Sequence, residues 1–270
     1  MRIHANGVEL NVLIEGEGPD VLLIHGYPDD HTVWRKQIPA LVAAGYRVIA
    51  PDTRGNGESS AATPYPQGYR ISNYVDDMIA ILDAVGSKKV RVVGHDWGAH
   101  PGWHLCMYHS ERIDRYVAVS VGHPNALSGA GIEQKLKSWY MLAFQARGVA
   151  EWSMSAFNWK LFRQVTGYPT ECDRWIPRLS QPGRLTASLG IYRANLKLFV
   201  THNFPASHVP AMGIWSSGDR FVKEKQMLDS ARYMEARWRY ERIDGANHWV
   251  QLDASEHFNA LLLDYFAISL

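Results

Sequence analysis

The sequence predicts an α/β fold: a mostly parallel central sheet, helices on both faces and an inserted helical segment. Over residues 1–124, short apolar runs alternate with helical stretches, which is the rhythm of parallel strands joined by covering helices. Over 125–205 helical patterns occur without a clear strand, and over 206–270 the alternation resumes. We therefore expect a core formed by 1–124 and 206–270, and a helical cap formed by 125–205.

Composition limits the classes of function. The 270-residue chain is long enough to bury a sizeable core. Its formal net charge is +1, so no charge excess points to nucleic acid or to an anionic membrane. No stretch approaches the ~20 apolar residues of a membrane span, and no apolar signal segment follows the first residues. We expect a soluble cytoplasmic protein without nucleic-acid or membrane partners.

Cysteine usage gives no sign of a disulfide framework or a metal site. The two cysteines, Cys106 and Cys172, fall in a helical run and in a polar stretch, so free thiols are expected. The chain contains neither CxxC nor HExxH. We therefore expect no metal and no cofactor.

The first half of the chain alternates strand and helix patterns. Residues 8–14 alternate apolar and polar side chains and predict an edge strand, and 21–24 form a fully apolar strand. Later segments continue the order, with helices expected over 34–43, 72–85 and 98–109 and strands over 46–50, 90–93 and 113–121. Because parallel strands end at one edge of a sheet, ligands are expected at that edge.

The most informative stretch is Gly-His-Asp-Trp-Gly at 94–98, directly after the 90–93 strand. A sharp strand-to-helix turn of this form raises its central side chain above the sheet edge, and it requires small residues on either side. The raised side chain is the carboxylate of Asp96, a candidate nucleophile. The alternative is that Asp96 only caps the following helix.

Two earlier loops also follow predicted strands. The first is His-Gly-Tyr-Pro at 25–28, which by itself indicates only a turn. The second, over 52–59, has glycines but lacks the third glycine of a dinucleotide loop and the Lys-Ser/Thr pair of a phosphate loop. We therefore interpret Asp52 and Arg54 as structural residues.

The segment 125–205 contains two apolar helical faces. One comprises Ile132, Leu136, Trp139, Tyr140, Ala143 and Phe144, and the other comprises Leu185, Leu189, Tyr192, Leu196 and Phe199. Each face carries one tyrosine. By spacing alone, such stripes indicate core packing.

The remaining strands are predicted over 211–215 and 238–243, each followed by a polar loop. Asp219 lies shortly after the first strand and His248 lies after the second. With Asp96 they follow the order nucleophile, acid, histidine of a hydrolase triad. His123 comes too early in the chain for the base. The final helix is expected to start with a capping box formed by Asp253 and Glu256.

Jointly, these motifs resemble the epoxide hydrolases and haloalkane dehalogenases of the α/β-hydrolase superfamily, over most of the chain. The resemblance implies an α/β-hydrolase fold in which Asp96 is the nucleophile. His248, oriented by Asp219, would then activate water. The backbone N–H groups of Tyr27 and Trp97 would form the oxyanion hole.

The same resemblance implies a cis bond between Tyr27 and Pro28. It also implies that His25 and His95 are supporting residues.

The resemblance to epoxide hydrolases specifically depends on the two tyrosines. In that family one cap tyrosine stands four residues before Phe-Gln and another in a Tyr-Arg pair, as Tyr140 and Tyr192 do here. It implies that both phenols assist opening of an epoxide ring to give a vicinal diol. The implied substrate pocket, for an apolar or aromatic epoxide, is lined by Trp97, Trp139, Phe144 and Trp249.

The main alternative is a haloalkane dehalogenase, which uses the same nucleophile, acid and base. That family often binds halide with an Asn in the slot held here by Tyr27, together with the residue corresponding to Trp97; only the Trp is present. A fluoroacetate-type enzyme would have arginines just after the nucleophile, where this chain has Trp-Gly-Ala-His at 97–100.

An esterase is disfavoured because no Gly-x-Ser-x-Gly occurs. The alternative outside catalysis is a receptor that uses the capped pocket for ligand binding, which would not need all five site residues. Expected partners are a small epoxide and water. A homodimer is left open, since the sequence does not define the oligomeric state.

Overall fold

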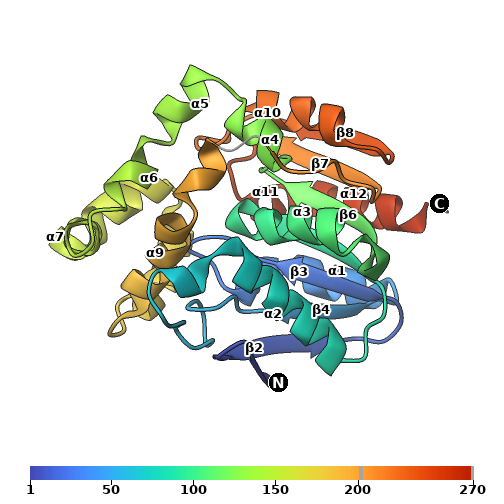
Figure 1. The fold of residues 1–270 in the computed structure, drawn as a ribbon, viewed down its shortest axis with the longest axis horizontal. Coiled ribbons are helices and arrows are strands. Elements are labelled where there is room, and N and C mark those ends of the chain that lie inside the picture. Colours follow the sequence, from blue (N-terminus) through green and yellow to red (C-terminus); the bar gives the residue numbers. More distant parts are fainter. Residues whose placement is uncertain (201–202, 269–270) are drawn as a thin grey trace.

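The computed structural model describes residues 1–200 and 203–268, and an eight-stranded sheet forms its centre (Figure 1). In chain order the strands are Arg2–Ala5 (β1), Val8–Glu15 (β2), Asp20–Ile24 (β3), Arg47–Pro51 (β4), Val90–His95 (β5), Ile113–Val119 (β6), Ala211–Ser216 (β7) and Trp238–Ile243 (β8). Their order in the sheet is β1-β2-β4-β3-β5-β6-β7-β8. The pairs β1–β2 and β2–β4 are antiparallel, and all others are parallel. The predicted mostly parallel sheet is thus confirmed.

Burial explains why the central strands are nearly continuous apolar runs. Val21 to Ile24 in β3 are fully buried, as are the valines at 92 and 93 in β5, because helices cover both faces of a parallel sheet. The prediction that 8–14 forms an edge strand is wrong. β1 pairs with the outer side of β2 and takes the edge position.

Helices cover both faces of the sheet. Ile71–Ala84 (α2) and Ala99–Tyr108 (α3) lie in front of it in Figure 1, and Gln37–Ala43 (α1) and Ser255–Ala267 (α12) lie behind it. Val250–Asp253 (α11) precedes α12, and Glu224–Asp229 (α10) follows β7. Both faces of the sheet are therefore covered, as predicted.

The predicted capping box of the last helix is wrong. α12 begins after Ala254, and no side chain caps it. Asp253 ends α11, and its carboxylate accepts hydrogen bonds from the Asn247 N–H (2.9 Å) and the Tyr168 hydroxyl (2.7 Å) instead.

Between β6 and β7 the described residues form helices and no strand. These are Pro124–Ser128 (α4), Ile132–Lys137 (α5), Trp139–Ala143 (α6), Val149–Thr166 (α7), Pro169–Leu179 (α8), Arg184–Ala194 (α9) and a short 3-10 helix at Leu196–Phe199. The first predicted helical face is divided at Ser138 between α5 and α6. The second ends at Ala194, so its last two residues lie in the 3-10 helix. Residues 201–202 of the predicted cap lie outside the described residues.

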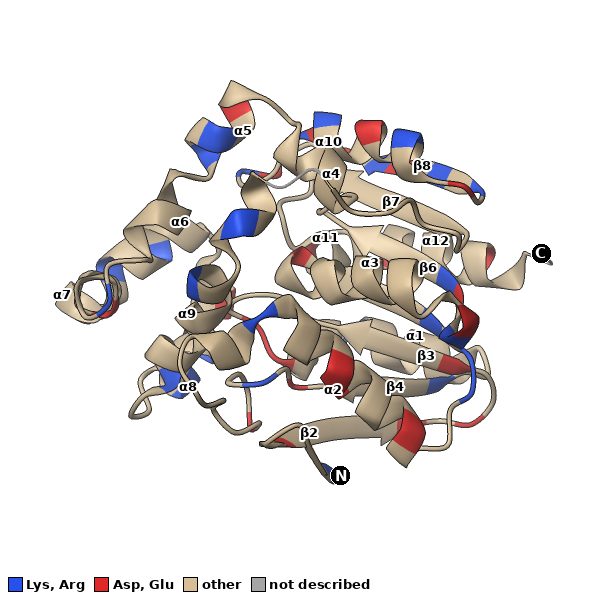
Figure 2. Cartoon of the chain, in the orientation of Figure 1, with Lys and Arg blue, Asp and Glu red and all other residues tan. Residues whose placement is uncertain are grey.

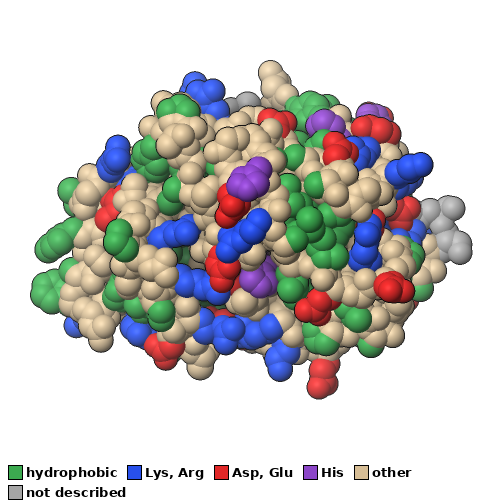
Figure 3. All heavy atoms as spheres, turned by 90° about the horizontal axis from the view of Figure 1, so that it is seen from below, with side chains coloured by type: hydrophobic (Ala, Val, Ile, Leu, Met, Phe, Trp, Pro, Cys, Tyr) green, Lys and Arg blue, Asp and Glu red, His purple; other side chains and the backbone are tan. Residues whose placement is uncertain are grey.

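The two parts differ in surface character. Large exposed apolar side chains concentrate on the inserted helices: Ile132, Leu136, Trp139, Leu142, Val149, Trp152, Phe157, Leu161 and Val200. Figure 3 shows hydrophobic side chains protruding at the left end, where these helices lie. Charges of both signs are distributed over both parts (Figure 2). No helix within the described ranges is long and apolar enough to cross a membrane.

Both cysteines are free, as predicted, and both are buried. Arg54 is buried, and it binds the Asp77 carboxylate through Nε (2.7 Å) and Nη2 (2.6 Å). The Asp52 carboxylate accepts hydrogen bonds from the Asn11 side chain and the Glu58 N–H. These contacts tie loop 52–59 to the core, which agrees with a structural role.

Candidate active site

Asp96 stands at the end of β5 in a left-handed backbone conformation, with φ of 53°. This conformation is costly for a residue with a side chain, and such strain persists only where the surroundings enforce it. A Cβ at position 94 would lie 2.6 Å from the Gly98 carbonyl oxygen, and one at 98 would lie 2.3 Å from the Ile24 carbonyl oxygen. The turn therefore needs both glycines, as the 94–98 pattern predicted.

The loop after β3 lies against the Asp96 side chain. A Cβ at Gly26 would come within 2.5 Å of Asp96 Cβ, so only glycine fits there. The Tyr27 N–H donates to Asp96 Oδ1 at 3.0 Å. The Tyr27–Pro28 bond is cis. His25, at the start of this loop, connects it to the loop after β4, since its Nε2 accepts a hydrogen bond from the Thr53 N–H at 2.9 Å.

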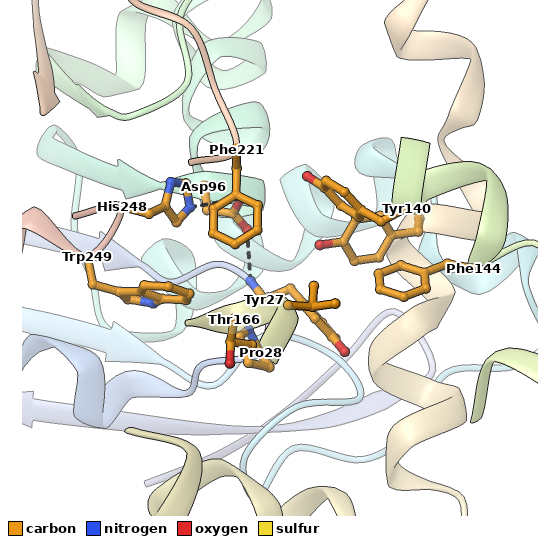
Figure 4. A pocket seen from close by; sticks show the side chains of 11 residues that line it. Tyr27, Pro28, Asp96, Tyr140, Phe144, Thr166, Phe221, His248 and Trp249 are labelled. Atoms are coloured by element: carbon orange, nitrogen blue, oxygen red, sulfur yellow. Dashed lines mark hydrogen bonds and ion pairs between the residues drawn. The ribbon is translucent and has the colours of Figure 1, made fainter. Parts of the chain in front are cut away.

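The structure brings Asp96, Asp219 and His248 together, and Figure 4 shows the side chains of Asp96 and His248 next to each other. His248 Nδ1 lies 2.7 Å from Asp219 Oδ2, and His248 Nε2 lies 3.4 Å from Asp96 Oδ2. The other Asp219 oxygen accepts the N–H groups of Phe221 (2.7 Å) and Val222 (2.9 Å). The imidazole is thus held between two carboxylates, with one Asp96 oxygen directed to it and the other to Tyr27.

These contacts determine the charges of Asp96 and His248. Burial opposes ionisation of Asp96, but hydrogen bonding and charge from His248, with the Trp97 N–H, outweigh it and lower the pKa of Asp96. Burial would also lower the pKa of His248, but Asp219 and Asp96 together raise it to about 10. At neutral pH the site therefore holds an ionised Asp96 beside an imidazolium.

Tyr140 and Tyr192 come from α6 and α9 and line one pocket with Asp96. Their ring centroids are 6.1 Å apart, and Tyr192 is edge-on to Tyr27 at 5.1 Å and to Trp97 at 4.9 Å. Burial, followed by neighbouring groups that include Asp96, raises the pKa of both phenols. Both are therefore protonated beside the carboxylate.

The pocket encloses about 350 Å³ of empty space, open solvent included. Its lining comprises Tyr27, Pro28, Asp96, Tyr140, Phe144, Val165, Thr166, Tyr192, Phe221, His248 and Trp249. In Figure 4, Tyr140 and Phe144 lie on the side opposite His248 and Trp249, with Asp96 between them. Trp97 lies outside this lining and lines a second cavity that also borders Asp96.

Trp139 lies outside the pocket, contrary to the prediction. It is 59% exposed, because neighbouring residues on a helix point about 100° apart and Tyr140 takes the inward direction. Phe144, four residues after Tyr140, shares the inward face, and the two rings are 5.7 Å apart.

Sequence reasoning missed several neighbours of the site. Phe221, whose ring centroid is 5.0 Å from that of His248, follows Asp219 by two residues and its position was the only available signal. Val165 and Thr166 come from α7, where nothing in the sequence marked them. Asp29 is buried, and its oxygens accept the indole N–H groups of Trp249 (2.8 Å) and Trp175 (2.9 Å).

His25 and His95, which we interpreted as supporting residues, do not line the pocket that contains Asp96. His95 Nε2 lies 3.0 Å from the His248 carbonyl oxygen. Burial, followed by the charge of His248, lowers the pKa of His95 to about 3. His123 is stacked on Tyr233, with ring centroids 5.0 Å apart.

Asp30, His31 and Asp52 are the one group in the described part of the chain with metal-ligand spacing. Asp52 Oδ1 is 2.6 Å from His31 Nδ1, and Asp30 pairs with Arg178 at 2.9 Å. Their polar atoms are already engaged in ion pairs, and the site chemistry above does not use them.

Comparison with known proteins agrees with this geometry. The sequence pattern of the alpha/beta hydrolase fold matches residues 19–255. The chain is 32% identical to AB hydrolase superfamily protein YfhM of Bacillus subtilis, covering 97% of this chain and 96% of the relative. It is 30% identical to Epoxide hydrolase A of Mycobacterium tuberculosis, covering 97% and 95%. The crystal structure of Epoxide Hydrolase A from Mycobacterium thermoresistibile superposes with a TM-score of 0.85 at 27% identity, covering 100% and 98%.

The family match spans most of the chain, and the relatives are covered over nearly their whole length. Fold, motif order and similarity lead to one conclusion, which confirms the resemblance that the motifs indicated: this chain belongs to the α/β-hydrolase superfamily, with epoxide hydrolases among its relatives.

Proposed function

We propose that the protein is an epoxide hydrolase that converts an apolar or aromatic epoxide to a vicinal diol through an ester on Asp96. The observation that carries this proposal is that Asp96 shares one pocket with two phenols, the buried Tyr192 and the half-buried Tyr140. The lowered pKa of Asp96 and the raised pKa values of both phenols agree with it. A nucleophile that displaces an epoxide oxygen needs an acid for that oxygen, and this arrangement supplies both.

In the first step Asp96 Oδ2 attacks a ring carbon while Oδ1 stays on the Tyr27 N–H. The carbon–oxygen bond of the ring breaks, its electron pair goes to the oxygen, and a phenol of Tyr140 or Tyr192 hydrogen-bonds or protonates that oxygen. The product is a hydroxyalkyl ester of Asp96. Such acid assistance is typically worth ~10²–10⁴ in rate.

In the second step His248 takes a proton from water, and the resulting hydroxide attacks the ester carbonyl carbon. Loss of the Asp96 charge removes one of the two carboxylates that raise the pKa of His248, and the imidazolium proton passes to the tyrosinate left by the first step, so His248 is then a neutral base. Asp219 holds its tautomer. The N–H groups of Tyr27 and Trp97 stabilise the tetrahedral oxyanion. Its collapse breaks the ester C–O bond, and the departing alkoxide takes the proton of the added hydroxyl, which leaves Asp96 ionised, His248 protonated and a free diol.

The helices of 125–205 act in this proposal as a cap over the core formed by 1–124 and 206–270. Both tyrosines come from this segment, with Phe144, Val165 and Thr166, while the core contributes the apolar side chains of Tyr27, Pro28, Phe221 and Trp249. The cap thus supplies the acid, and the core supplies the nucleophile and the base.

A haloalkane dehalogenase is the second candidate, favoured only by Trp97 beside Asp96. A halide leaving group needs N–H donors and no proton. Two phenols facing the carboxylate give no advantage in that reaction.

Initial rates on an aryl epoxide, an alkyl epoxide, a haloalkane and an aryl ester test the proposal. We expect turnover of the epoxides, and loss of that turnover by ~10⁴-fold or more in Asp96→Asn, as for other nucleophile deletions. Asp76→Asn, the same change at an exposed residue of α2, is the control and keeps the parent rate. Turnover of the haloalkane but of neither epoxide would overturn the assignment.

A further inference from the structure

A second cavity borders Asp96 next to the pocket described above. It shares Asp96, Tyr140, Tyr192 and Phe221 with that pocket, and Trp97 and His100 are among its other walls. An epoxide ring held between the phenols and Asp96 would therefore border this cavity as well.

The second cavity leads into a wider apolar space between α4–α6 and the 3-10 helix at Leu196–Phe199. Five residues line both: Leu127, Gln134, Ser138, Met141 and Phe199. The wider space holds about 960 Å³, open solvent included, and Leu142 and Val200 are among its walls. The two spaces therefore adjoin, and the outer one, called the chamber below, is mostly apolar and opens to solvent beside the exposed Leu142 and Val200.

His100 lies on the wall of the second cavity, in the first turn of α3, and Asp96, just before that helix begins, lines the same cavity. The His100 ring contacts Trp97 at 5.2 Å and Phe199 at 6.3 Å between centroids. His100 and the reacting carboxylate therefore border one cavity.

The His100 side chain is only 2% exposed, and its Nδ1 has no hydrogen-bond partner within residues 1–200 and 203–268. Buried polar atoms are nearly always paired, so an orphan beside a cavity indicates a partner that enters it. Burial, followed by the charge of His104, lowers the pKa of His100 to about 3. The ring is therefore neutral, and it suits an uncharged hydrogen-bonding group better than a carboxylate.

Resting on the proposed function, we propose that His100 determines specificity for epoxides that carry an uncharged oxygen close to the ring and an apolar group beyond it. The oxygen, as in a glycidyl ether, hydrogen-bonds the His100 imidazole. The apolar group then lies in the chamber lined by Leu142, Phe199 and Val200. His100 touches the substrate but takes no part in bond making.

The test compares two epoxides of equal length, phenyl glycidyl ether and 4-phenyl-1,2-epoxybutane, in which a CH₂ replaces the ether oxygen. The intrinsic reactivity of each substrate is the same for every enzyme variant. The change in the ratio of their kcat/KM values between variants therefore reports the His100 contact alone.

We expect His100→Leu, which fills similar space but removes the hydrogen bond, to lower the ratio of kcat/KM for the ether to kcat/KM for its CH₂ analogue. The expected decrease is about tenfold, as for loss of one hydrogen bond. His100→Gln, which can still donate and accept, restores most of the ratio. His257→Leu, the same change at an exposed histidine of α12, leaves it unchanged.

An unchanged ratio in His100→Leu, or an equal loss for both substrates, overturns the inference and leaves His100 a packing residue while the proposed function stands. If His100→Leu does not fold, an unaltered ratio in a folded His100→Phe, which keeps a ring but neither donates nor accepts a hydrogen bond, has the same consequence. If the wild-type protein opens neither epoxide, the proposed function fails, and the inference that rests on it fails too.

Discussion

The core and the inserted helices hold their site residues in different ways. Asp96 and Asp219 follow the buried strands β5 and β7, His248 follows the edge strand β8, and hydrogen bonds fix both oxygens of Asp219 and one of Asp96. Tyr140 and Tyr192 are held by aromatic packing, on helices whose outer faces expose large apolar side chains. In the proposed mechanism this difference corresponds to two tasks: the core would make and hydrolyse an ester, and the insertion would select the leaving group.

The largest expected effect separates formation of the ester on Asp96 from its hydrolysis. His248→Gln keeps a polar side chain of similar reach but removes the base, so the ester on Asp96 should form and persist. We expect turnover to fall by ~10⁴-fold or more. Intact mass after mixing with epoxide should show protein plus substrate.

A folded His248→Gln protein that neither turns over nor gains mass would show that His248 is not the hydrolytic base. Circular dichroism checks the fold. Asp96→Asn should gain no mass under the same conditions.

The next effect concerns the insertion. Either Tyr140→Phe or Tyr192→Phe keeps the aromatic packing and leaves one phenol, so alkylation of Asp96 by the epoxide should slow only partly. The double change removes all acid assistance and should cost within or beyond ~10²–10⁴-fold, more than the product of the single effects. Tryptophan fluorescence in stopped flow measures the alkylation rate.

A folded double variant that opens epoxides near the parent rate would return both tyrosines to a packing role. If the double variant lost activity on epoxides but kept activity on a haloalkane, the tyrosines would be needed for the epoxide oxygen alone, and the core would suffice for ester formation and hydrolysis.

A smaller effect separates the two steps by pH in the unmodified protein. The pKa of Asp96 is lowered and those of both phenols are raised, so alkylation should change little between pH 8 and pH 5. Hydrolysis needs neutral His248, whose pKa Asp219 still raises in the ester. It should therefore slow as pH falls, by about tenfold or more over that range.

Single-turnover rates of ester formation and decay, measured across this range, check the prediction. A decay rate that is flat, or that rises as the pH falls, would contradict the role of His248.

The smallest expected effect lies at the outer face of the insertion. Trp139→Ala removes an exposed side chain and should leave kcat/KM within about twofold, as is usual for surface changes. Phe144→Ala, on the inward face of the same segment, should lower kcat/KM for aryl epoxides much more. Equal losses in the two variants would show that Trp139 reaches the substrate.

The core could be predicted well from the sequence, because its signals are local. The 94–98 pattern requires glycines where a Cβ would collide with backbone, and the buried strands are visible as apolar runs. The edge position escaped prediction because β1 is a four-residue strand whose sequence carries little apolar signal.

The insertion was harder to predict. Its helices are short and are broken at Ser138 and after Ala194, so one apolar stripe does not belong to one helix. The stripe placed Trp139 beside Tyr140, although only one of two adjacent residues can face the pocket. Asp29, Thr166 and His100 escaped notice because their surroundings come from chain segments far apart in sequence.

The central claim is that Asp96 itself becomes covalently attached and is hydrolysed at its own carbonyl carbon. A single turnover in heavy-oxygen water, with enzyme in excess over epoxide, tests it most directly. We expect the label in the Asp96 carboxylate, located by peptide mass spectrometry, and an unlabelled diol. Label in the diol on the first turnover would mean that water attacks the epoxide directly, and it would contradict the account.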